Sequence, residues 1–116
     1  GSILTQKQCC SPLIKSRSYV YAADTAYSPK VVDAAKNATL LYHEATFMEK
    51  DKRIANKTLH STSKDAAKVA QEAKVTKMII GHFSNRYRDL QPLLIEAREV
   101  FINSELAVEG KTIVIE

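Results

Sequence analysis

The chain has 116 residues, of which 45% are apolar and 26% are charged, and this balance is typical of one soluble globular domain. Its net charge of +4 permits an anionic partner such as nucleic acid without requiring one. No apolar run approaches the ~20 residues of a membrane span and no signal peptide is visible, so we expect a cytoplasmic protein without membrane contact.

Residues 1–17 are expected to form an irregular leading segment, because they are mixed in character and contain a Ser11-Pro12 dipeptide. Gly1 and Ser2 look like the scar of an expression tag. Cys9 and Cys10 are adjacent and lack the spacing of a zinc site, which indicates reduced thiols. The folded domain is expected over residues 18–116.

From residue 18 onward, strand-like and helix-like segments alternate. The expected N-cap is Ser28 for the first helix, Thr62 or Ser63 for the second, and Asp89 for the third. The predicted elements are a strand at 18–24, a helix at 28–37, a strand at 38–46, a polar and basic connection at 47–59, a helix at 62–75, a strand at 76–80, a helix at 89–101, and two strand-like runs about Gly110.

This order predicts a layered α/β domain whose principal strands are parallel. The run at 38–46 is almost continuously apolar rather than alternating, which predicts a strand buried on both faces. The 47–59 connection is long, and long connections are often functional.

Polar side chains follow each of the three predicted parallel strands. The first ends at Asp24, the second in His43-Glu44, and the third is followed by His82, while His60 lies in the connection that enters the next helix from the same edge. Since ligands of open parallel sheets bind beyond the carboxyl ends of the strands, we expect these residues to converge on one site.

Carboxylate and imidazole groups suit zinc, and Glu44 with His60 could instead transfer protons. Other interpretations stay open: Asp24 could cap the following turn, His43 is more typical of a structural histidine, and the basic residues at 50–57 are more typical of a solvated surface. Catalytic zinc takes at least three protein ligands, and Asp24 with His82 supply two.

Four motifs carry a resemblance to a known family. The stretches AADT (22–25), HEATF (43–47), HST (60–62) and GHFSNRY (81–87) resemble those of ribonuclease Z, the transfer-RNA 3′-processing endonuclease of the metallo-β-lactamase superfamily. The closing stretch at 93–115 is similar to that family's last helix and strands. The resemblance implies the C-terminal half of an αββα sandwich, with mostly parallel strands and a terminal β-hairpin.

The resemblance also implies roles for single residues. Asp24 would bridge two zinc ions and His82 would bind one of them. His60 would sit beside the scissile phosphate as proton donor or charge stabiliser, and Glu44 would orient it. Ser84 and Arg86 would help to hold substrate phosphate.

The implied activity is zinc-dependent removal of the 3′ trailer from precursor transfer RNA, by a homodimeric enzyme. The family's H-x-H-x-D-H motif, another histidine ligand and the RNA-gripping arm are absent from the chain, so we expect the chain alone to be inactive and to retain little zinc. The alternatives are another phosphodiesterase or arylsulfatase of the same fold, and a non-catalytic α/β interaction module.

Overall fold

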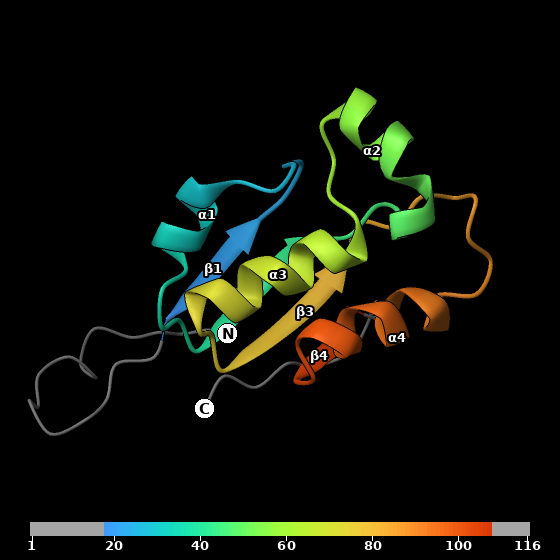
Figure 1. Cartoon of the computed structure of the whole chain (residues 1–116). Coiled ribbons are helices and arrows are strands. Elements are labelled where there is room, and N and C mark those ends of the chain that lie inside the picture. Colours follow the sequence, from blue (N-terminus) through green and yellow to red (C-terminus); the bar gives the residue numbers. More distant parts are fainter. Residues whose placement is uncertain (1–17, 108–116) are drawn as a thin grey trace, which may run out of the picture.

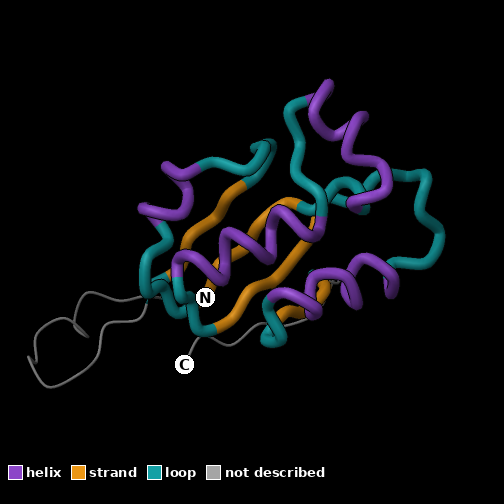
Figure 2. The backbone as a smooth tube through the Cα atoms, in the orientation of Figure 1, coloured by secondary structure: helices purple, strands orange, loops and turns teal. Residues whose placement is uncertain are grey.

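The computed structural model describes residues 18–107, which form a four-stranded sheet covered on one face by helices (Figures 1 and 2). The strands lie side by side in chain order, and each neighbouring pair is parallel, as the alternation predicts. The elements are β1 (Tyr19–Ala22), α1 (Pro29–Ala34), β2 (Leu40–Glu44), η2 (Glu49–Asp51), α2 (Lys52–Thr58), α3 (Ser63–Ala73), β3 (Lys77–Gly81), α4 (Gln91–Val100) and β4 (Ser104–Leu106).

Helix α3 forms the centre of the helical layer, where it packs on β2 and β3 and is flanked by α1 and α4 (Figure 1). Its predicted apolar face is fully buried, and the small alanine side chains of that face let the helix lie close to the sheet. Thr62 is its cap: the Thr62 hydroxyl accepts from the Asp65 backbone N–H, and the Asp65 carboxylate accepts from that of Thr62. This capping box fixes where the helix begins, directly after His60 and Ser61.

The other helix ends differ slightly from the prediction. Ser28 caps α1 as expected, but α1 ends at Ala34, and the backbone reaches a left-handed conformation at Asn37. Helix α4 begins at Gln91 with Leu90 at the cap position, so the cap predicted at Asp89 is wrong by one position. The Asp89 carboxylate still accepts from the Gln91 N–H, which satisfies one free donor of the helix start.

The predicted connection at 47–59 is not irregular throughout, because it contains η2 and α2. Ala55 is the one buried residue of α2, so the segment lacks the apolar stripe that would have indicated a helix. Phe47 and Thr62 form an isolated parallel bridge at the base of this excursion. The chain therefore leaves the sheet after β2 and returns at Thr62, beside Phe47.

β2 is buried on both faces as predicted, apart from the half-buried Tyr42. The first of the two strand-like runs about Gly110 corresponds to β4, and the second lies outside the described residues, as do residues 1–17. The predicted terminal hairpin is therefore not described. None of the helices within residues 18–107 has the length and hydropathy that crossing a membrane requires.

Candidate metal and catalytic site

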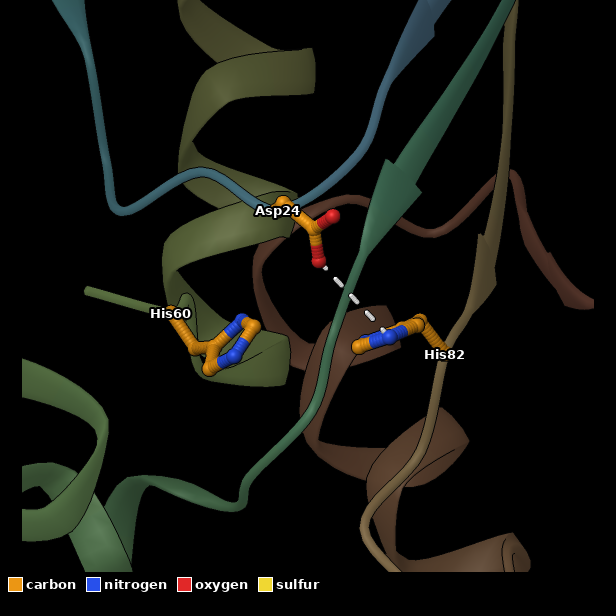
Figure 3. A group of neighbouring side chains, drawn as sticks. All are labelled: Asp24, His60 and His82. Atoms are coloured by element: carbon orange, nitrogen blue, oxygen red, sulfur yellow. Dashed lines mark ion pairs between the residues drawn. The ribbon is translucent and has the colours of Figure 1, made fainter. Parts of the chain in front are cut away.

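Asp24 and His82 lie at the same edge of the sheet, beyond the carboxyl ends of β1 and β3 (Figure 3). The nearest carboxylate oxygen of Asp24 is 3.7 Å from Nε2 of His82. Both side chains are open to solvent, with exposed fractions of 74% and 51%. The capping interpretation of Asp24 is not supported, because its carboxylate faces the histidine while Ser28 caps α1.

Both residues have positive φ angles, 52° at Asp24 and 61° at His82. Residues other than glycine seldom adopt this conformation, and such strain is concentrated at functional sites, where the surrounding structure maintains it. Here the left-handed turns redirect the chain directly at the strand ends. They allow the two side chains to face one another across the intervening end of β2.

His60 completes a cluster of three possible metal ligands. Asp24, His60 and His82 each offer one ligand atom, and these atoms all lie within 4.8 Å of one another (Figure 3). The rings of His60 and His82 are 5.5 Å apart between centroids. One carboxylate and two imidazoles match the donor types that zinc takes in proteins, so these residues fit the metal that the resemblance implies.

Glu44 lies beneath this cluster with its side chain fully buried. Its Oε1 accepts from the backbone N–H of Thr25 (2.8 Å) and of Ser61 (3.1 Å), and its Oε2 accepts from the Thr46 hydroxyl. Nδ1 of His60 lies 2.9 Å from Oε1 and 2.8 Å from Oε2. A buried carboxylate needs partners for its charge, and Glu44 has four donors.

The contact with Glu44 determines how His60 is presented. Because an ionised carboxylate only accepts hydrogen bonds, Nδ1 of His60 carries a proton and Nε2 is left for the cluster. Ser61 fixes the loop further, since its hydroxyl donates to the Thr25 carbonyl. The loop is thus tied to β2 and to the turn after β1.

His43 does not belong to this cluster. Its side chain is fully buried, its Nδ1 contacts the Glu44 carbonyl at 2.8 Å, and its Nε2 has no hydrogen-bond partner among the described residues. Burial lowers the pKa of His43, which keeps the imidazole neutral near pH 7. This position agrees with the interpretation of His43 as a structural histidine.

Ser84 and Arg86 lie in the turn after His82, where both have partners within the protein. The Ser84 hydroxyl accepts from the Arg86 N–H at 3.3 Å. The Arg86 guanidinium lies over the Phe47 ring at 5.3 Å and is 3.6 Å from the Asp51 carboxylate. These contacts hold the turn against the segment after β2.

Sequence reasoning missed Thr46 and the Asp51–Tyr87 pair. The Tyr87 hydroxyl donates to Asp51 and accepts from the Met48 N–H at 2.8 Å. Burial and the hydrogen bond to Asp51 raise the pKa of Tyr87 to about 12. Residues 46 and 87 fall inside the HEATF and GHFSNRY stretches, so the motifs were the available signal, although their contacts depend on the tertiary structure.

No protein-family model matches the chain. Among curated proteins, the ribonuclease Z of Cytophaga hutchinsonii is 45% identical over 106 residues, which are 91% of this chain and 34% of that protein. The ribonuclease Z of Porphyromonas gingivalis is 45% identical over 101 residues, 87% of this chain and 33% of that protein. The chain thus spans about a third of the length of the curated relatives it matches.

Solved structures give the same assignment. The metallo-β-lactamase fold protein YhfI of Bacillus subtilis matches with a TM-score of 0.76 and 27% identity, over 83% of this chain and 39% of that one. The short form of human tRNase Z matches with a TM-score of 0.57 and 28% identity, over 73% of this chain and 27% of that one. The chain is therefore similar in sequence to about a third of ribonuclease Z, and its fold is that of part of a metallo-β-lactamase protein.

Proposed function

We propose that this chain supplies part of the active site of a zinc-dependent endoribonuclease that removes the 3′ trailer from precursor transfer RNA. The observation that carries the proposal is the cluster of Asp24, His60 and His82 above the buried Glu44, in a chain that is 45% identical to ribonuclease Z. The proposed enzyme is cytoplasmic and homodimeric, and the remaining zinc ligands come from outside this chain.

Asp24 and His82 are the residues that would hold zinc. Zinc in such a site stabilises charge on a phosphoryl oxygen and lowers the pKa of a bound water. The chain's own contribution is to present one carboxylate and one imidazole from two strand ends that the sheet holds in register. Because this makes only two ligands, we expect the 116-residue chain alone to bind zinc weakly. Metal analysis that finds two tightly held zinc ions per chain would contradict this.

His60 is the proposed proton donor to the departing ribose 3′-oxygen. Its Nδ1 is held by Glu44, which would leave Nε2 as the nitrogen that meets the reacting groups. The buried carboxylate maintains the orientation of the ring. Ser84 and Arg86 are proposed to contact substrate phosphate, with Arg86 exchanging its contact with Asp51 for one with RNA.

The test uses the longest protein product that contains this chain, with precursor transfer RNA and a chromogenic phosphodiester as parallel substrates. The His60→Ala variant should lose ~10²–10⁴ in RNA cleavage while zinc content is unchanged. It should lose far less activity on the chromogenic ester, because a nitrophenolate leaves without protonation. The Asp24→Ala variant should lose zinc and activity on both substrates.

Three results would argue against the proposal. Unchanged RNA cleavage by His60→Ala would remove its catalytic role. Loss of zinc in that variant would make His60 a ligand instead of an acid. Turnover of the chromogenic ester without any cleavage of precursor transfer RNA would favour a small-molecule phosphodiesterase of the same fold.

A further inference from the structure

The Thr46 side chain lies between Glu44 and His82 and contacts both of them. Its Oγ1 donates to Oε2 of Glu44 and lies 3.0 Å from Nδ1 of His82. Thr46 is 6% exposed and Glu44 is fully buried, so this contact is largely shielded from water. The hydroxyl is therefore placed to couple the buried carboxylate to the exposed histidine.

The proton count decides the direction of both hydrogen bonds. A threonine hydroxyl has one proton, and the ionised carboxylate of Glu44 can only accept. The Thr46 proton therefore goes to Glu44, and the Thr46 oxygen accepts from the remaining neighbour. Nδ1 of His82 must then carry a proton, which leaves the lone pair of Nε2 on the side where Asp24 lies 3.7 Å away.

Backbone hydrogen bonds hold the two segments in the register that this contact requires. The Ala45 N–H donates to the Gly81 carbonyl at 2.8 Å, and the Ser84 N–H donates to the Thr46 carbonyl at 2.9 Å. The segment after β2 is thus joined to the segment after β3 on both sides of His82. Thr46 contacts the second segment through its backbone and its side chain, which fixes the hydroxyl relative to the imidazole.

We infer that Thr46 is a positioning residue that selects the Nδ1–H tautomer of His82 and so presents Nε2 as a metal ligand. Glu44 then orients both histidines of the cluster, His60 directly and His82 mainly through the Thr46 hydroxyl, because Nδ1 of His82 is 3.0 Å from Thr46 Oγ1 but 3.7 Å from Oε2 of Glu44. The metal-binding consequence rests on the proposed function, whereas the tautomer assignment stands on the hydrogen bonds alone. Partners of this kind that orient a ligand typically change metal affinity by ~10–100-fold when they are removed.

The first experiment measures the imidazole nitrogens of ¹⁵N-labelled 116-residue chain by long-range ¹H–¹⁵N correlation, without zinc and at a pH where the rings are neutral. His82 is expected as the Nδ1–H tautomer in the parent chain. Thr46→Val keeps the shape but removes the hydroxyl, and should shift His82 toward the Nε2–H form that imidazole favours in water. Thr46→Ser should restore Nδ1–H, and His60 should remain Nδ1–H in all three chains.

An Nε2–H tautomer of His82 in the parent chain would overturn the inference, whatever the variants do. So would an unchanged His82 in Thr46→Val. Should Thr46→Val fail to fold, the tautomer in the parent and in Thr46→Ser decides the question.

The second experiment measures zinc affinity in the longest protein product that contains this chain. Thr46→Val should lower the affinity ~10–100-fold and Thr46→Ser should restore it. Asp24→Ala is the comparison that separates the two proposals. If zinc affinity is insensitive to Asp24→Ala, the proposed metal site is wrong, while the tautomer result stands. If Asp24→Ala loses zinc and Thr46→Val does not, the inference about Thr46 is wrong.

Discussion

Replacing Glu44 with glutamine tests the claim that one buried carboxylate organises the site. The substitution preserves the shape of the side chain but removes the charge and turns one acceptor oxygen into an NH₂ donor. Every group within hydrogen-bonding distance of the Glu44 carboxylate is a donor: the backbone N–H groups of Thr25 and Ser61, the Thr46 hydroxyl and Nδ1 of His60. At the new NH₂ group, His60 can accept only by changing tautomer and Thr46 only by reversing its hydroxyl, so at least one of the present hydrogen bonds is lost or reversed.

The structure allows the cost to be worked out. A hydrogen bond to a charged group contributes about 1.5–3 kcal/mol and a neutral one about 0.5–1.5 kcal/mol, so the bonds that keep an oxygen acceptor each weaken by about 1 kcal/mol. Two such bonds remain at Oε1, from Thr25 and Ser61. The hydrogen bond to Oε2 that is lost at the new NH₂ group adds about 1–3 kcal/mol. We expect Glu44→Gln to lower the free energy of unfolding by about 3–5 kcal/mol.

The assay is urea unfolding of the 116-residue chain followed by circular dichroism, with the tautomer of His60 measured in the same samples. In Glu44→Gln, His60 should lose its Nδ1 proton, because Nδ1 can then accept from the new amide. Glu99→Gln is the matched control, since Glu99 is exposed on α4, and it should leave stability close to that of the parent chain. Stability of Glu44→Gln within about 0.5 kcal/mol of the parent, the usual range for surface substitutions, would refute the reasoning.

Three further predictions concern the surroundings of the site. Burial lowers the pKa of His43, so below its unfolded pKa of about 6.5 the folded chain binds fewer protons than the unfolded chain. The free energy of unfolding should therefore fall by up to about 1.4 kcal/mol per pH unit as the pH drops. His43→Leu should flatten this fall in urea titrations at pH 7.5 and 5.5. An equally steep fall in His43→Leu would exclude His43 as the cause. Tyr87→Phe should cost about 1–3 kcal/mol, because the Asp51 carboxylate loses a donor. It should also remove one tyrosine from those that titrate above pH 10 in ultraviolet absorbance, and an unchanged amplitude there would contradict the assignment to Tyr87. Gly81→Ala should lower the free energy of unfolding by about 1–3 kcal/mol, since its new Cβ would come within 2.9 Å of the Tyr42 ring. Adding Tyr42→Ala should recover part of that loss. Purely additive effects of the two substitutions would show that the contact is not the cause.

The sequence alone determined the order of the elements and the residues at the strand ends. Parallel strands end at one edge of a sheet, so the local positions of Asp24 and His82 were enough to predict that they meet, and the structure brings them to 3.7 Å. The buried strand at β2 and the alanine face of α3 followed from local composition in the same way. These features depend on periodicity and on neighbours in the chain, which a sequence displays directly.

Tertiary structure decided the parts that depend on contacts between distant segments. Helix α2 was missed because its residues have no apolar stripe, and its place is set by the Phe47–Thr62 bridge at its base. The role of Thr46 was invisible because a threonine at that position has no local partner; only the pairing of β2 with β3 places His82 beside it. Burial and hydrogen-bond direction are properties of the packed chain, and they decide which nitrogen of each histidine is free.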